Sequence, residues 1–140
     1  MATVLTQVIT EWNNFHLNGP FPTKMLLDID TDRSIGPLLD RFNDSTHAIQ
    51  SLLKQSIDQN ERFRAFGKGW SLSNIAHQSD RMLMNTSLNI KQEITTAQLH
   101  TETSYKAENL FLFQCGIKVK QISEYLLDKR KSLKTCGASN

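Results

Sequence analysis

The chain has 140 residues, of which 39% are hydrophobic, so it is long enough to bury one hydrophobic core. Its 16 Lys and Arg residues nearly balance its 14 Asp and Glu residues, which leaves a net charge of +2. Such a balance creates no strong field toward nucleic acid or an anionic membrane, so we expect neither as a partner.

The sequence contains no evident targeting or membrane-spanning segment. Residues 1–15 lack a basic region followed by an apolar run, and no stretch approaches the roughly 20 apolar residues of a membrane span. We therefore predict a soluble, cytoplasmic protein whose two cysteines, Cys115 and Cys136, are reduced and buried, with a single disulfide between them as the alternative. The histidine spacings match no metal site, and no catalytic residue can be named from spacing; the four histidines are His16, His47, His77 and His100.

Residues 1–43 are predicted to form an irregular amino-terminal arm with one short helix or strand. Aromatic side chains such as Trp12 and Phe21 anchor it, while Gly19-Pro20 and Pro22 interrupt it. A helix from Asp44 to Gln59 follows, and we expect its apolar positions to pack against a strand over Phe63–Phe66. Those positions are Ile49, Leu52, Leu53 and Ile57.

A glycine loop with the sequence GKGWSLS, residues 67–73, comes directly after that strand. Two glycines around one residue let the backbone turn sharply and expose several N–H groups on one side, and Ser71 and Ser73 add hydroxyl donors. This combination suits a phosphate or diphosphate, and it predicts a positive φ at Gly67 or Gly69. The spacing fits neither G-x-G-x-x-G nor G-x-x-x-x-G-K-[ST], so a tight turn without a ligand is the alternative.

The remaining elements predict further strands and a second helix. Met82–Met84 is an apolar run, residues 88–94 alternate as in a half-exposed strand, and residues 96–108 form a hairpin or loop. Leu110–Cys115 indicates a buried strand, and Gly116 leads into a helix with Val119, Ile122 and Leu126 on one face. Residues 132–135 form a strand or loop. The order of elements predicts an α+β fold with a small mixed sheet and flanking helices.

Three segments in this order resemble the FAD-binding domain of the vanillyl-alcohol-oxidase type, also called the p-cresol-methylhydroxylase type. They are residues 49–76, with helix, strand and glycine loop; residues 113–129, FQCGIKVKQISEYLLDK; and residues 133–140, LKTCGASN. Within that family the aldonolactone oxidase and sugar-alcohol oxidase branch is most similar, because it carries G-x-G-[HW]-S-[FL]-S and resembles the early WNNF at residues 12–15.

The resemblance implies that residues 44–140 are the amino-terminal half of an FAD-binding domain, truncated before the rest of that domain and the substrate domain. It implies non-covalent FAD, because Trp70 stands where some relatives carry the His that bonds to the flavin. The loop would wrap the FAD pyrophosphate. The implied cofactor-binding residues are Gly67, Lys68, Gly69, Trp70, Ser71, Leu72, Ser73, Ser139 and Asn140.

The function implied by the resemblance is the FAD-binding portion of an oxidase or dehydrogenase. The full-length parent would act on the CH–OH group of a small-molecule alcohol or sugar lactone. The chain alone is expected to be inactive and to hold FAD weakly, since little protein would surround the flavin ring. A nucleotide-binding module without redox activity and a small soluble α+β domain are the alternatives.

Overall fold

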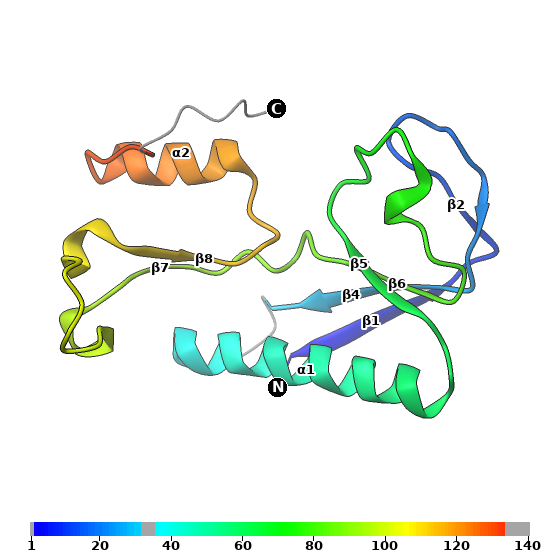
Figure 1. Cartoon of the computed structure of the whole chain (residues 1–140), viewed down its shortest axis with the longest axis horizontal. Helices are drawn as coiled ribbons and strands as arrows, with labels where there is room; N and C mark the ends of the chain where they lie inside the picture. Colours follow the sequence, from blue (N-terminus) through cyan, green and yellow to red (C-terminus); the bar gives the residue numbers. More distant parts are fainter. Residues whose placement is uncertain (1, 32–35, 134–140) are drawn as a thin grey trace. The chain divides into compact units, whose positions relative to one another are not determined.

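The computed structural model describes residues 2–31 and 36–133, and these contain a mixed β-sheet and two helices (Figure 1). This confirms the predicted combination of a small mixed sheet with helices. The chain divides into two compact units, Met1–Leu88 and Asn89–Asn140, which are described separately. The expected boundary between residues 43 and 44 lies within a helix of the first unit.

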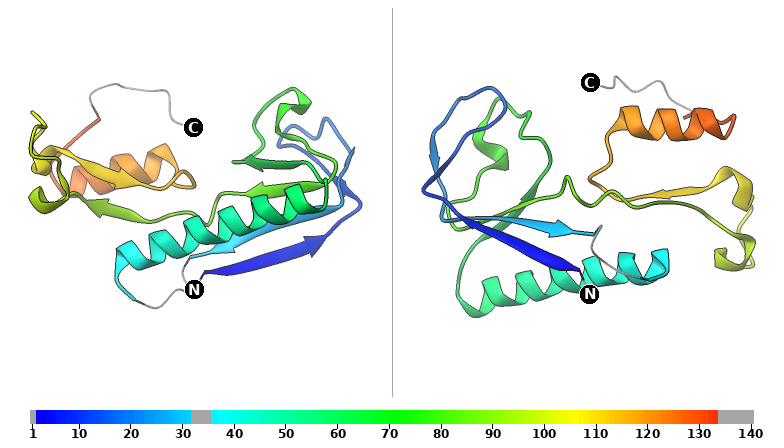
Figure 2. Two further views of the ribbon diagram at one scale, coloured as in Figure 1. Left: turned by 60° about the horizontal axis from the view of Figure 1, so that its bottom comes forward. Right: turned by 180° about the vertical axis from the view of Figure 1, so that it is seen from behind.

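The first unit is built on a four-stranded sheet with the strand order β1-β4-β6-β5. Strand β1 is antiparallel to β4, whereas β4, β6 and β5 are mutually parallel. Helix α1 lies along this sheet (Figures 1 and 2). The bounds are β1 Thr3–Val8, β4 Met25–Asp30, α1 Leu38–Asp58, β5 Phe63–Phe66 and β6 Arg81–Met84.

The prediction of an irregular arm over residues 1–43 was wrong for β1 and β4, which belong to the main sheet. In β4 the side chains alternate, and Leu27 and Ile29 are fully buried beneath α1. The strands were missed because the partners of β4 are distant in sequence, and β6 begins only at Arg81. Between them, β2 (Glu11–Trp12) and β3 (Phe21–Pro22) form a short antiparallel ribbon.

Helix α1 begins at Leu38 rather than at Asp44, and it buries a different face from the one expected. Leu52 is buried and Ile49 packs against the core, but Leu53 is 42% exposed and Ile57 is 77% exposed. The predicted packing of Leu53 and Ile57 was therefore wrong. The buried face of the helix includes two serines, Ser45 and Ser56, at positions that the helical period places on the same side. Their hydroxyls donate to backbone carbonyls of the preceding turn. The fully buried members of this face are Ser45, Leu52 and Ser56.

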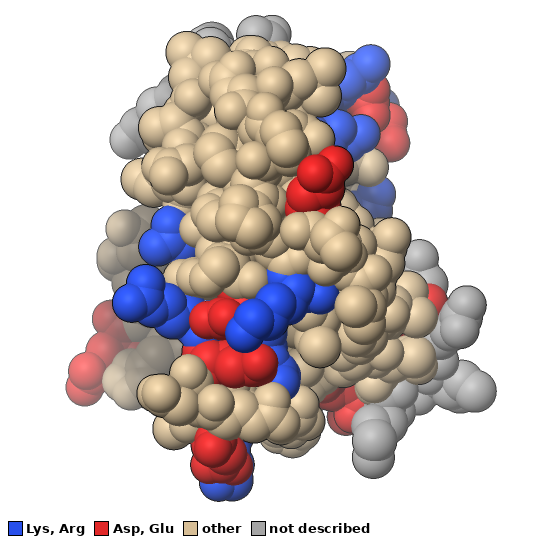
Figure 3. Space-filling view, turned by 90° about the vertical axis from the view of Figure 1, so that its right-hand side faces the viewer, with Lys and Arg blue, Asp and Glu red and all other residues tan. Residues whose placement is uncertain are grey.

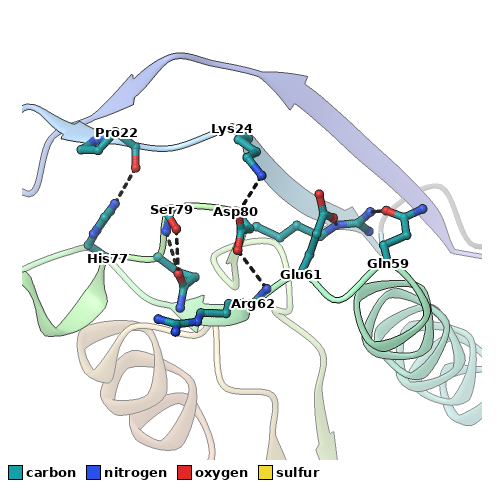
Figure 4. Close-up of polar contacts among 10 residues, drawn as sticks. Pro22, Lys24, Gln59, Glu61, Arg62, His77, Ser79 and Asp80 are labelled. Carbon is teal, nitrogen blue, oxygen red and sulfur yellow. Dashed lines mark hydrogen bonds and ion pairs between the residues drawn. The ribbon is translucent and has the colours of Figure 1, made fainter.

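Among the described residues of this unit, the buried cation is Arg81. The Arg81 side chain, at the start of β6, is only 7% exposed, and its Nε donates to Glu61 at 2.6 Å. Its remaining nitrogens bond to the side-chain oxygens of Gln55 and Gln59 at the end of α1. Gln59 and Glu61 are labelled in Figure 4. These partners replace the water that the guanidinium loses on folding, so they join the end of α1 to β6.

Asp80, just before β6, joins three segments of the first unit. Its carboxylate lies 2.8 Å from the Lys24 ammonium and accepts the Arg62 backbone N–H at 3.1 Å (Figure 4). The hydrogen bond from Lys24, followed by that from Arg62, holds the pKa of Asp80 below its usual value. The same hydrogen bond to Asp80 raises the pKa of Lys24.

These shifts predict how the stability of the first unit depends on pH. A depressed carboxyl pKa contributes stability above the unfolded-state value of about 3.9, and this contribution disappears as the pH falls through the folded-state pKa. We expect Asp80→Asn to lower the midpoint of urea unfolding by a constant amount between about pH 5 and pH 9. At acidic pH, once Asp80 of the wild type is protonated, the two midpoints should become equal. A pH series of urea unfolding curves tests this, and a difference that persists undiminished at pH 2 would contradict it.

The second unit pairs an antiparallel hairpin with helix α2 (Val119–Asp128). Strands β7 (Lys91–Glu93) and β8 (Phe111–Phe113) form the hairpin, and Tyr125 of α2 meets the rings of Phe111 and Phe113 edge-on. Leu126 is buried as predicted, but Val119 is exposed. The expected buried strand Leu110–Cys115 is shorter and half-buried, because it belongs to a two-stranded hairpin rather than to a covered sheet.

Several other expectations can be placed. Cys115 is an exposed free thiol rather than a buried one, whereas Cys136 lies outside the described residues, as do positions 134 and 135. Within residues 2–31 and 36–133, no helix is long and apolar enough to cross a membrane. The same residues contain no group of His, Cys, Asp and Glu side chains that could hold a metal ion.

Candidate functional site

The glycine loop connects two neighbouring parallel strands. Strand β5 has the predicted bounds and ends at Phe66, the loop spans residues 67–73, and a single 3-10 turn, η1 (Asn74–Ala76), precedes the chain's return to β6. The loop therefore leaves the sheet at the carboxyl end of β5. Ligands of open sheets with parallel strands bind beyond the carboxyl ends of the strands, so the loop has a suitable position for a binding site.

Gly69 has a φ of +65°, which confirms the predicted left-handed conformation, whereas Gly67 is not in this region. A Cβ atom at Gly69 would lie 3.0 Å from Trp12 Cζ2 and 3.3 Å from Cη2. The second glycine of the motif is therefore required for two reasons: its backbone conformation and the close approach of Trp12. At Gly67 a Cβ would meet only Asn85 Oδ1, at 3.6 Å.

Four successive carbonyl groups of the loop accept hydrogen bonds from residues 14–18, which we call the latch segment. The pairs are Phe15 N–H to Gly69 O at 2.9 Å, His16 Nε2 to Trp70 O at 3.1 Å, Asn14 Nδ2 to Ser71 O at 2.8 Å and Asn18 Nδ2 to Leu72 O at 2.8 Å. A carbonyl can only accept, so the His16 proton must be on Nε2 in this arrangement. The latch segment thus binds the carbonyl side of the loop along its length.

This pattern determines where the N–H groups of the loop point. In a trans peptide the C=O of one residue and the N–H of the next point in opposite directions, and the loop contains no cis peptide. The N–H groups of residues 70–73 therefore point away from the latch segment. The Ser73 N–H contacts Ser71 Oγ at 3.3 Å, and the Ser71 and Ser73 hydroxyls are 2.9 Å apart. The backbone N–H groups of residues 70–73 thus lie on the side opposite the latch segment, where the Ser73 N–H and the two hydroxyls bond to one another.

Asn14 is the central residue of the latch segment. Only 3% of its surface is exposed. Both ends of its side-chain amide form hydrogen bonds: Oδ1 accepts the Asn18 N–H at 2.9 Å, and Nδ2 donates to Ser71 O. The contact between the WNNF segment, residues 12–15, and the loop was not predicted from the sequence. The only available signal was the two asparagines, whose side chains commonly satisfy backbone groups in turns.

The surface around the loop is apolar and almost uncharged. Trp70 is 48% exposed, and its ring stacks on that of Phe15 with the centroids 4.1 Å apart. Segments 9–22 and 67–79 carry only two charged residues, Glu11 and Lys68. In Figure 3 the central part of the upper surface shows no Lys, Arg, Asp or Glu, whereas charged residues gather below it and along its right-hand edge. The other large apolar side chains exposed here are Leu17, Leu72 and Ile75.

The structure brings together the predicted residues of the loop, Gly67 to Ser73, with Lys68 exposed at its start. Ser139 and Asn140 lie outside the described residues. Comparison of the chain with protein-family models, curated proteins and solved structures finds no match.

Proposed function

We propose that the glycine loop binds the diphosphate of FAD and that the chain is the FAD-binding portion of a flavin-dependent oxidoreductase. The observation that carries this proposal is the direction of the N–H groups of residues 70–73, opposite the carbonyls that the latch segment holds. A diphosphate needs several donors, and backbone N–H groups on one side of the loop would supply them without burying a lysine.

The order of the elements supports the same assignment. Helix α1, strand β5, the loop, and later strand β8, Gly116 and helix α2 follow one another as the resemblance to the vanillyl-alcohol-oxidase type implies. When bound, the flavin would accept a hydride from the CH–OH carbon of an alcohol or sugar lactone. The residues of this chain would hold and orient the cofactor. Trp70 cannot form the covalent link that a histidine makes, so the FAD would be non-covalent.

A titration of the ¹⁵N-labelled chain tests the proposal at the loop itself. We expect pyrophosphate, ADP and FAD to shift the amide signals of residues 70–73, and riboflavin, which lacks phosphate, to leave them in place. Affinities should be weak, with Kd on the order of 0.1–1 mM, because one loop covers only part of the cofactor. If pyrophosphate shifts no loop amide even at about ten times the upper end of this Kd range, the loop is only a tight turn.

The titration also separates FAD from nucleotides in general. The resemblance places residue 70 beside the flavin ring, so FAD but not ADP should shift the indole Nε1–H signal of Trp70. Identical shifts with both ligands would favour the nucleotide-binding alternative.

Two neighbouring asparagines provide a matched control. Asn14→Ala removes the buried amide that holds Ser71 O, and we expect about tenfold weaker pyrophosphate binding. Asn13 is exposed, so Asn13→Ala should bind like the wild type. Equal losses in both variants would contradict the role assigned to the latch segment.

A further inference from the structure

The two edges of the main sheet differ in their protection. Strand β5, at one edge, is four residues long and carries Arg64, whose guanidinium bonds to the Ile75 carbonyl of η1, the turn that contacts this strand. Strand β1, at the other edge, is six residues long, and among the described residues β4 is its only neighbouring strand. Short length, charge and coverage are the usual means by which proteins protect an edge, and among the described residues of the first unit none of them protects β1.

The sequence of β1, TVLTQV, favours pairing with another strand. It has no charge, no proline and no glycine, and four of its six residues are β-branched, namely Thr3, Val4, Thr6 and Val8. Leu5 is 42% exposed and Val8 is 80% exposed, so apolar side chains stand at the open edge. An uncharged, exposed edge strand with unpaired backbone groups is a template for strand addition.

Hollows lie on both faces of the sheet beside β1. On the face covered by α1, Val4 lines a hollow of about 340 Å³ with Ala48 and Leu52. On the other face, Leu5 and Gln7 line a hollow of about 220 Å³ with Leu26 and Met84. The side chains of an added strand point alternately to the two faces, so such a strand would place side chains in both hollows.

We infer that β1 is a self-association surface, and that the partner is the β1 strand of a second copy of this chain, paired antiparallel about a two-fold axis near residues 5 and 6. The strand is compatible with itself because no like charges face each other along it. Asp44, the acid that lines the α1-side hollow, lies with Ala2 and Val4 near one end of β1. An antiparallel arrangement therefore places the two Asp44 carboxylates at opposite ends of the interface.

Sedimentation equilibrium of the 140-residue chain tests this inference. We expect a reversible monomer–dimer equilibrium in the wild type and at least a tenfold weaker association in Leu5→Lys, because two lysines would face each other near the axis. Val8→Lys, at a more exposed position, provides a second variant in case Leu5→Lys fails to fold. An equimolar mixture of Leu5→Lys and Leu5→Glu should recover the dimer, since opposite charges then meet across the strands.

Leu72→Lys is the matched control, because Leu72 is also an exposed leucine but lies in the glycine loop. It should dimerise like the wild type. A wild-type chain that stays monomeric at millimolar concentration would overturn the inference. So would a dimer that Leu72→Lys weakens while Leu5→Lys and Val8→Lys leave it intact, since association would then use the apolar surface around the loop.

Discussion

Glu61→Leu is expected to destabilise the first unit by about 3 kcal/mol, because it leaves the Arg81 guanidinium buried without its charged partner. The Arg81 side chain is 7% exposed and that of Glu61 is 25% exposed, so water cannot fully replace the lost carboxylate. Gln55 and Gln59 remain as neutral acceptors, which is why we expect a value at the lower end for a broken buried pair. Urea unfolding curves measure the difference.

Two further variants separate the cost of a stranded charge from the value of the ion pair. Replacing both residues, as in Glu61→Leu with Arg81→Met, should recover most of the stability, since neither charge is then buried. Asp58→Asn breaks the exposed Lys54–Asp58 pair and should cost no more than about 0.5 kcal/mol. A double variant less stable than Glu61→Leu alone would show that the stranded Arg81 charge is not the source of the loss.

Gly69→Val should both destabilise the first unit and abolish pyrophosphate binding by the loop. A β-branched residue at a φ of +65° is strained, and its Cβ would lie 3.0 Å from Trp12 Cζ2. We expect a cost of about 2–3 kcal/mol from backbone strain and the displacement of Trp12. Because the Gly69 carbonyl accepts the Phe15 N–H, the strain also acts on the first bond between loop and latch segment.

Gly67→Ala is the matched control for this prediction. Its Cβ would have ordinary contact with Asn85 Oδ1 at 3.6 Å, and its φ is not in the positive region. Stability should change by no more than about 1 kcal/mol, and the pyrophosphate-induced amide shifts should persist. Thermal unfolding and the amide titration test both variants, and equal effects at the two glycines would contradict the assignment of strain to Gly69.

Features that depend on local chemistry were predicted from the sequence. Strand β5 has the expected bounds, and Gly69 has the expected conformation, because paired glycines report directly on backbone freedom. The buried face of α1 was only partly predicted. The apolar positions of α1 include Leu53 and Ile57, but the sheet selects the stripe through Ser45, Leu52 and Ser56. Small serines that bond to their own helix can be buried as readily as leucines, so hydrophobicity alone does not identify the face.

Features that depend on partners distant in sequence were not predicted. Asn14 contacts Ser71 across 57 positions, and β4 pairs with a strand that begins at Arg81. Residue type and spacing within residues 1–43 indicate strands and turns, but they do not identify which distant segments these residues contact. The role of the latch segment therefore became visible only when the two segments were placed side by side.

The hydrogen bonds between the latch segment and the glycine loop also affect the conformational entropy that ligand binding would cost. Fixing the backbone of a free loop costs roughly 1–2 kcal/mol per residue, and a ligand that orders such a loop must supply that free energy from its own contacts. Here the four carbonyls from Gly69 to Leu72 are already bonded in the folded chain. An arriving anion would meet donors whose directions are set in advance, so its affinity would depend on the number and geometry of those donors rather than on the cost of organising them.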